Sequence, residues 1–120
     1  MTGPAVVYKL VDAEDWRVAT VDGAYPGSAV DLRDGYIHMS TADQLAETAR
    51  RHFRGLPDLL KVTIDTAAMA DLPDEALRWE PSRGGALFPH LYAPLPLSAV
   101  RSVEACHVDA DGRLVLETEA

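Results

Sequence analysis

The sequence has little cysteine and little positive charge. Of its 120 residues, one is cysteine and 11 are lysine or arginine, against 19 aspartate or glutamate, which gives a formal net charge of −8. The single thiol, Cys106, excludes an intramolecular disulfide and a zinc site built mainly from cysteines. The acidic balance argues against general nucleic-acid binding, because that binding takes most of its free energy from Lys and Arg side chains on phosphates.

Long apolar runs are missing too. The apolar stretch over residues 5–11 is interrupted by Lys9 and is far shorter than the ~20 residues that a transmembrane helix needs. The same segment lacks the charged start and the long apolar centre of a secretory signal. We therefore expect a cytoplasmic protein with no membrane contact, folded as a single domain over residues 1–120.

The strong catalytic motifs are absent as well. The chain contains no G-x-x-x-x-G-K-[ST] phosphate loop, no G-x-G-x-x-G turn, no H-E-x-x-H pair and no G-x-S-x-G elbow. The histidines His38, His52 and His90, even taken with Glu80, match no compact ligand spacing, so we expect no metal site. Two short segments nevertheless concentrate reactive side chains.

Most of the regular structure is predicted to be strand. Asp12 is a typical N-cap for a helix over 13–20, and Thr41 with Gln44 forms a capping box that begins a second helix. Residues 65–71 are predicted to form a helical turn. Residues 22–34 and 94–97 are predicted to be irregular connections. The pattern predicts an α+β domain with a mostly antiparallel β core and one or two main helices. Strands are expected at 6–11, 35–39, 59–64, 77–80, 86–92, 100–108 and 113–118.

The first reactive segment spans residues 34–41. His38 and Ser40 are two residues apart on a predicted strand, so their side chains point to the same face. Together with the start of the following helix they offer several hydrogen-bond donors to one ligand. A structural interpretation also accounts for the segment, with Ser40 and Thr41 capping the helix and His38 bonded to a backbone carbonyl.

The second reactive segment spans residues 78–92. Extended backbone from 88 to 92 places Phe88, His90 and Tyr92 on one face, and Arg83 has the geometry to hold a phosphate or carboxylate in a bidentate pair. In the structural alternative, Phe88 and Tyr92 are core aromatics, Glu80 and Arg83 form a surface pair, and the diglycine at 84–85 is a turn.

A third cluster, the basic run over residues 50–54, has two interpretations. It either faces nucleic acid or forms the solvated end of a helix, where positive charges are favourable against the helix dipole. Cys106 and the adjacent His107 would face opposite sides of a strand, so they do not form a simple Cys–His pair.

The chain resembles the bacterial family catalogued as domain of unknown function 952. The resemblance rests on residues 8–10, 34–44, 78–85 and 88–92 and covers nearly the whole chain. It implies a fold like that of the ADP-ribosyltransferases, which include the RNA 2′-phosphotransferases. Those enzymes place a His in an early strand, followed two residues on by Ser or Thr, against the ribose and nicotinamide of NAD, and His38 and Ser40 match that pattern.

The resemblance implies a small transferase that uses NAD, or a related small anionic nucleotide-like ligand, as its substrate. Glu80 is the candidate for the late catalytic carboxylate of that superfamily, because it lies in one of the segments that carry the resemblance. A non-catalytic binding module that uses the same pocket remains an alternative, and an RNA 2′-phosphotransferase-like enzyme is a third. The implied catalytic residues are His38, Glu80 and His90, and the implied nucleotide contacts are His38, Ser40, Thr41, Arg83, Phe88 and Tyr92.

Overall fold

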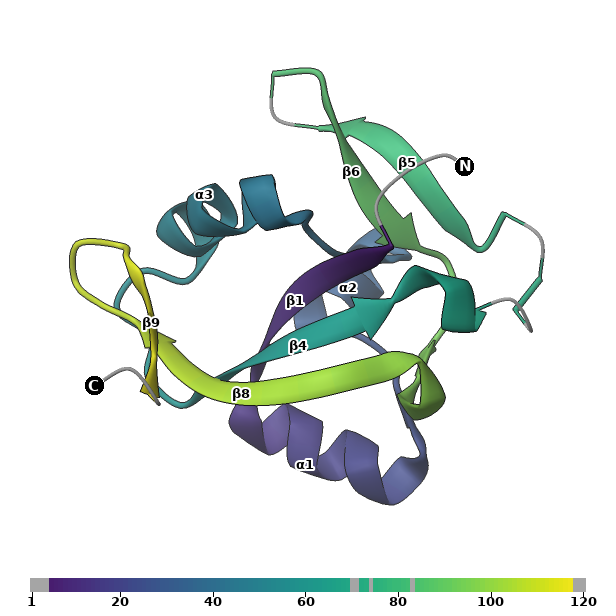
Figure 1. The fold of residues 1–120 in the computed structure, drawn as a ribbon, viewed down its shortest axis with the longest axis horizontal. Helices are drawn as coiled ribbons and strands as arrows, with labels where there is room; N and C mark the ends of the chain where they lie inside the picture. Colours follow the sequence, from purple (N-terminus) through teal and green to yellow (C-terminus); the bar gives the residue numbers. More distant parts are fainter. Residues whose placement is uncertain (1–4, 70–71, 74, 83, 118–120) are drawn as a thin grey trace.

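A four-stranded antiparallel sheet forms the centre of the computed structural model, which describes residues 5–69, 72–73, 75–82 and 84–117 (Figure 1). Its strand order is β1-β4-β8-β9, and a second sheet of order β3-β6-β5 lies beside it. The strands are β1 (Val6–Asp12), β2 (Ala24–Tyr25), β3 (Ile37–His38), β4 (Leu59–Asp65), β5 (Leu77–Ser82), β6 (Ala86–Leu91), β7 (Leu95–Pro96), β8 (Val100–Val108) and β9 (Leu114–Leu116). The helices are α1 (Ala13–Asp22), α2 (Ala29–Asp34) and α3 (Ala42–His52), with 3₁₀ turns at Thr66–Met69 and Leu97–Ala99.

Alternating side chains give the main sheet two buried faces. Val7 and Val11 of β1 join the larger core cluster, which also contains Trp16 of α1 and, from the second sheet, Ile37 and Leu91. Leu10 faces the other way and packs in a smaller cluster with Leu45 of α3. Lys9 lies between Val7 and Val11 in the strand, so a cation is placed on the apolar face of β1.

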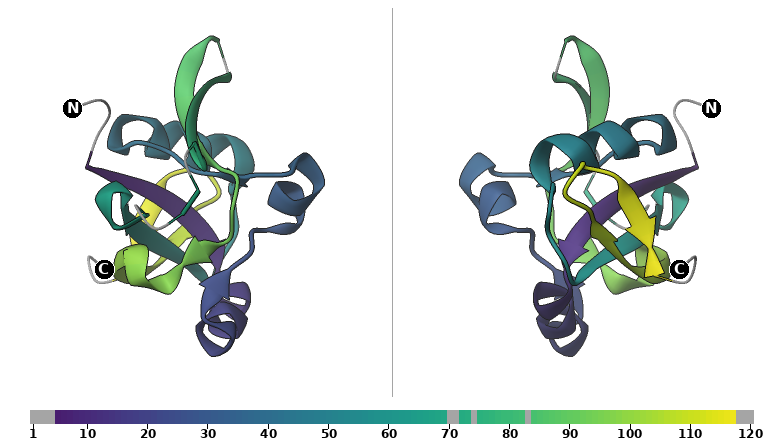
Figure 2. Two further views of the ribbon diagram at one scale, coloured as in Figure 1. Left: turned by 90° about the vertical axis from the view of Figure 1, so that its right-hand side faces the viewer. Right: turned by 90° about the vertical axis from the view of Figure 1, so that its left-hand side faces the viewer.

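The second sheet brings the two reactive segments together. β6 is its central strand, and its register places His90 opposite both His38 of β3 and Arg78 of β5. Just after β3, Ser40 and Tyr8 of β1 exchange two backbone hydrogen bonds of 2.8 and 2.9 Å, which join this sheet to the main one. Figure 2 shows the β5–β6 hairpin projecting from the body of the molecule, with α2 lying out to one side.

The connection predicted over residues 22–34 is wrong in part, because it contains the short strand β2 and the helix α2. The Ser28 hydroxyl accepts from the Asp31 N–H, and the Asp31 carboxylate accepts from the Ser28 N–H, so the pair is a capping box. An aspartate in place of the usual Glu or Gln hides this signal in the sequence. Residues 95–96, also expected to be irregular, pair with β2 as β7, where Pro96 is tolerated on a short edge strand.

The α+β class and the antiparallel β core are confirmed. Asp12 caps α1 by accepting from the Glu14 and Asp15 N–H groups, as predicted, although the helix runs to Asp22. α3 begins after Thr41 as predicted, and its Leu45 and Ala49 are buried. In the part of the chain that the structure describes, no helix is long and apolar enough to cross a membrane.

Candidate functional site

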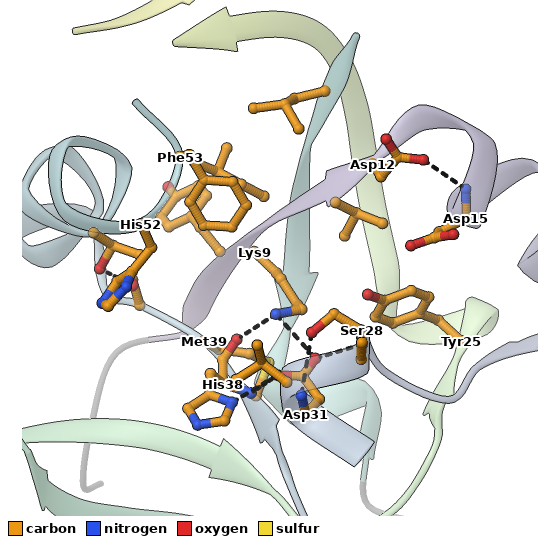
Figure 3. Close-up of a pocket in the computed structure, with 18 of the residues that line it drawn as sticks. Lys9, Asp12, Asp15, Tyr25, Ser28, Asp31, His38, Met39, His52 and Phe53 are labelled. Atoms are coloured by element: carbon orange, nitrogen blue, oxygen red, sulfur yellow. Dashed lines mark hydrogen bonds and ion pairs between the residues drawn. The ribbon is translucent and has the colours of Figure 1, made fainter. Parts of the chain in front are cut away.

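A cleft of about 840 Å³ opens between β1, α2, β3, α3 and the β5–β6 hairpin; we call it the His38 cleft. Its volume falls within the range of roughly 300–1,000 Å³ that is typical of small-molecule sites. Polar groups reach it from each of these elements, and Figure 3 shows those of Lys9, Asp31, His38 and His52. Among the residues that line it are Lys9, Asp31, Asp34, His38, Ser40, Thr48, His52, Ser82, Phe88 and His90.

The buried carboxylate of Asp31 holds His38 in place. Asp31 Oδ1 lies 2.6 Å from His38 Nδ1 and accepts the His38 backbone N–H at 3.1 Å, while Oδ2 accepts the Ser28 N–H at 2.9 Å. Burial alone would raise the pKa of Asp31, but the hydrogen bond from His38, the charge of Lys9 and the two backbone donors hold that pKa well below its ordinary value. Asp31 is therefore ionised, and His38 Nδ1 is the donor in the pair.

Lys9 supplies the counter-charge from the apolar face of β1. Its Nζ lies 3.1 Å from Asp31 Oδ2 and donates to the His38 carbonyl at 2.9 Å. Burial lowers the pKa of Lys9, and the charge of Asp31 opposes that shift. The side chains of Lys9 and Asp31 are 7 % and 2 % exposed, so the loss of either would leave an unpaired charge away from water.

A second carboxylate faces the other nitrogen of the imidazole. Asp34, at the end of α2, places Oδ2 3.0 Å from His38 Nε2. Its pKa is lowered, first by a hydrogen bond from Arg33 at 2.9 Å. The two ring nitrogens of His38 thus face two carboxylates, Asp31 at Nδ1 and Asp34 at Nε2.

His90 repeats this arrangement on the neighbouring strand. Its Nδ1 lies 2.8 Å from Glu80 Oε1, and the Tyr92 hydroxyl donates to the same oxygen at 2.7 Å. These two hydrogen bonds lower the pKa of Glu80, and the bond to Glu80 raises the pKa of Tyr92. At neutral pH Glu80 is thus a carboxylate and Tyr92 a neutral phenol, both fixed from the β5–β6 hairpin.

Aromatic rings join the two imidazoles. The Tyr36 ring stacks on His90 with centroids 4.2 Å apart and an angle of 29°, and it lies 4.6 Å from His38 and 5.1 Å from Tyr92. The guanidinium of Arg78 lies over the Tyr92 ring, 4.2 Å from its centroid. Close packing of this kind restricts the orientation of both histidines, as a site that needs fixed donors requires.

His38 and Ser40 line the same cleft, in keeping with their two-residue spacing. The Ser40 side chain is nearly fully buried, and its hydroxyl pairs with the Thr48 hydroxyl of α3 at 2.8 Å. Thr41 is the N-cap of α3, and its N–H donates to Gln44 Oε1 at 3.1 Å. Thr41 is not among the described residues that line the cleft.

The second reactive segment divides between the cleft and its edge. Phe88 is buried and lines the cleft next to His90. Glu80 reaches the site through its contact with His90, whereas Tyr92 lies on the outer side of the ring cluster and is half-exposed. The predicted phosphate contact of Arg83 falls on a residue outside those that the structure describes.

Sequence reasoning missed Asp31, Asp34, Lys9 and Tyr36 as members of the site. The spacing of Ser28 and Asp31 was the available signal for α2, and a lysine inside an apolar strand was the signal for Lys9. Neither signal indicates a contact with His38, because Asp31 and Lys9 meet His38 only when the fold brings their segments together. Tyr36 carries no such signal.

The weaker candidates take structural roles in the described part of the chain. Arg50 and Arg51 both pair with Glu47 on α3, at 2.5 and 2.7 Å, which fits a solvated helix surface. Cys106 is buried, and His107 pairs instead with Glu117 at 2.5 Å. No group of three or more His, Cys, Asp or Glu side chains within the described residues is arranged to hold a metal ion.

Comparison with known proteins gives a family and a fold but no activity. The model of the family DUF952, described as a protein of unknown function, matches residues 10–103. The crystal structure of protein CC0527 from Caulobacter crescentus is 40% identical, covers 95% of each chain and has a TM-score of 0.82. The solution NMR structure of CC0527 is 43% identical over 92% of this chain and 91% of that one, with a TM-score of 0.75. A search of the curated proteins found no match.

Proposed function

We propose that this chain, which belongs to the DUF952 family, binds NAD or a related nucleotide in the His38 cleft and acts as a small ADP-ribosyltransferase-like enzyme. The observation that supports it most is the pair of imidazoles, His38 and His90, each held at Nδ1 by a carboxylate beside a cleft of about 840 Å³. Fixed donors, stacked rings and a carboxylate in one cleft suit a ribose-containing ligand better than a plain apolar one.

His38 has the central role in nucleotide binding. Its Nε2, now beside Asp34, forms a hydrogen bond with a ribose hydroxyl when the ligand displaces that carboxylate. The Ser40 hydroxyl bonds to Thr48 and has the capacity for a further hydrogen bond, with which it orients the nicotinamide end. Thr41 holds the start of α3 beside it. Phe88 lines the cleft and offers a ring for stacking, Tyr92 offers a second ring beside Tyr36, and Arg83 is the expected contact of the pyrophosphate.

Glu80 supplies the electrostatic part of catalysis. In the transfer, the glycosidic bond between ribose and nicotinamide breaks, nicotinamide leaves with the bonding electrons, and positive charge develops on the ribose. A carboxylate beside the ribose stabilises this positive charge. An acceptor nucleophile then bonds to the ribose carbon that nicotinamide left, and the nucleophile gives up its proton. Hydrogen bonds from His90 and Tyr92 lower the pKa of Glu80 and fix its position, as this role requires.

The net charge of −8 is compatible with an anionic ligand. Charges farther away than a Debye length of about 8 Å are largely screened in physiological salt. Near His38, Lys9 neutralises Asp31, and the carboxylates of Asp12 and Asp15 lie on the far side of Lys9 from His38 (Figure 3). A pyrophosphate can therefore bind through a few local donors inside an acidic protein.

One observation favours a non-catalytic binding module as the second candidate. Glu80 Oε1 already accepts from both His90 and Tyr92, which reduces the availability of this carboxylate to a reacting ribose. A protein of this kind would bind the same nucleotide without breaking it. The RNA 2′-phosphotransferase-like function needs a basic face, and Arg50 and Arg51 are engaged with Glu47 instead.

Calorimetry with NAD tests the proposal. We expect heat of binding from the wild-type protein and from His107→Ala, whose imidazole lies outside the cleft, and a loss of at least about tenfold in affinity in His38→Ala. Absence of heat in the wild type, or equal affinity in all three proteins, contradicts nucleotide binding. Assay of free nicotinamide then separates the two candidates, since release supports the transferase and binding without release supports the module.

A further inference from the structure

The end of the cleft away from His38 carries a separate set of groups, which we call the acidic end: Asp12, Asp15, Asp58 and Tyr25. All four line the cleft, and Figure 3 shows Asp12, Asp15 and Tyr25 on the far side of Lys9 from His38. The elements that place them are the start of α1, the strand β2 and the segment before β4, where the Asp58 carbonyl accepts the Ala13 N–H at 2.9 Å. The proposed nucleotide contacts use none of these residues.

The three carboxylates differ from the others in the cleft because they lack counter-charges. Asp31 pairs with Lys9 and Asp34 with Arg33. Among the described residues, no lysine or arginine forms an ion pair with the carboxylates of the acidic end, which are exposed at its rim. Asp12 accepts only the two backbone N–H groups that it caps at the start of α1.

Tyr25 brings a polar group from the core to the acidic end. The residue is 1 % exposed, its ring packs against Trp16 with centroids 5.7 Å apart, and its hydroxyl points into the cleft (Figure 3). Within the residues that the structure describes, this hydroxyl makes no hydrogen bond, and because every fully buried side-chain polar atom has a partner, it is open to the cleft. Burial raises the pKa of Tyr25, and the charges of Asp31, Asp15 and Asp12 raise it further, so the phenol stays neutral. A hydroxyl held in this way is available to a ligand.

The acidic end suits an organic cation better than a metal ion. A metal needs three or more ligands that converge on one point, and no described group of this kind is arranged so. Leu56 and Pro57, next to Asp58, add apolar wall to the same cleft. A cation on an alkyl stem matches both features, since its charge lies among the carboxylates while its stem covers the apolar wall.

We propose that the acidic end binds a cationic nitrogen group on an alkyl stem, a guanidinium or a primary ammonium, with the Tyr25 oxygen accepting one of its N–H groups. The carboxylates of Asp15 and Asp58 supply the complementary charge. This site goes beyond the proposed nucleotide function, because it uses the opposite end of the cleft and does not depend on NAD. It assigns an amine or a guanidine as a ligand class of the protein.

The test uses n-butylguanidinium and its neutral isostere n-butylurea as probes, titrated into ¹⁵N-labelled protein and followed by NMR. We expect n-butylguanidinium to shift the amide signals around the acidic end, and n-butylurea to leave them unchanged. The double variant Asp15→Asn/Asp58→Asn should weaken binding about tenfold or more, and Tyr25→Phe should weaken it several-fold. The matched control is Asp22→Asn/Asp111→Asn, which removes the same charge from exposed positions outside the cleft.

The control separates a site from the general attraction of an acidic protein. Equal weakening in the two double variants, shifts spread over the whole surface, or equal binding of the neutral probe would each overturn the proposal, as would no binding at all. Because Tyr25 is buried, the unfolding temperature of Tyr25→Phe is measured first. If Tyr25→Phe does not fold, the comparison of Asp15→Asn/Asp58→Asn with its control decides the outcome.

Discussion

His38 and His90 are cross-strand partners, with ring centroids 5.6 Å apart, and each presents Nδ1 to a carboxylate from another element. Asp31 holds the first imidazole and Glu80 the second. The two carboxylates differ in burial, since Asp31 is 2 % exposed and Glu80 is 33 % exposed. This difference predicts different consequences for mutation, because the free energy of an ion pair depends strongly on its contact with water.

Asp31→Asn should destabilise the protein by about 3–5 kcal/mol, because it removes a negative charge and leaves Lys9 buried without a counter-charge. The comparison variant is Asp34→Asn. The Asp34 carboxylate contacts the other ring nitrogen of His38, Nε2, from an exposed position. We expect that variant to lose less than about 1 kcal/mol. Urea unfolding at pH 7 measures both values, and equal losses would show that burial of Asp31 is not what matters.

The dependence of stability on pH should also report Asp31. Its pKa in the folded protein lies below the ordinary value of 3.8, so its contribution to the free energy of unfolding is complete above that value. The contribution is lost as the pH falls from about 4 towards the folded pKa. Urea unfolding of the wild type and of Asp31→Asn, from pH 6 to the lowest pH at which both fold, should therefore give converging stabilities below about pH 4. Parallel curves would contradict the assignment.

Gly27 should be needed to keep Asp31 in place. Its φ is +118°, and a Cβ at this position would lie 2.8 Å from the Asp31 Cβ. Gly23 has a φ of +90° with no atom within 4 Å of such a Cβ, so Gly23→Ala has backbone strain without the clash. We expect Gly27→Ala to cost about 1–3 kcal/mol more than Gly23→Ala and to weaken NAD binding, measured by urea unfolding and calorimetry. Equal costs would mean that Asp31 moves aside freely.

Glu80→Gln separates binding from catalysis. The amide keeps the size of the side chain but removes the charge that stabilises the developing cation, so release of nicotinamide should fall about 10²–10³-fold. Affinity for NAD should change by less than about threefold, because the proposed binding contacts come from other residues. Tyr92→Phe, which removes one hydrogen bond to Glu80 and keeps its charge, should reduce release only modestly. Unchanged release in Glu80→Gln would remove Glu80 from the catalytic role.

The local elements of this protein follow closely from its sequence. The capping signals at Asp12 and Thr41 locate the starts of α1 and α3, and the β-branched run at 59–64 locates β4, because these signals act over a few residues. The helix α2 escaped this reasoning, since its six residues carry only the unusual capping pair of Ser28 and Asp31. Short elements with weak signals depend on tertiary contacts for their stability.

The sequence by itself determined the α+β class, the family and the reactive segments around His38 and His90. Only the tertiary structure decided that a buried ion pair of Lys9 and Asp31 orients His38. It also decided that His38 and His90 lie opposite each other on neighbouring strands of the second sheet. It also decided that Tyr25 points into the acidic end of the cleft. The physical reason is range: caps and strand patterns depend on neighbours in the chain, whereas these contacts join segments that become neighbours only when the apolar faces of the sheets are buried.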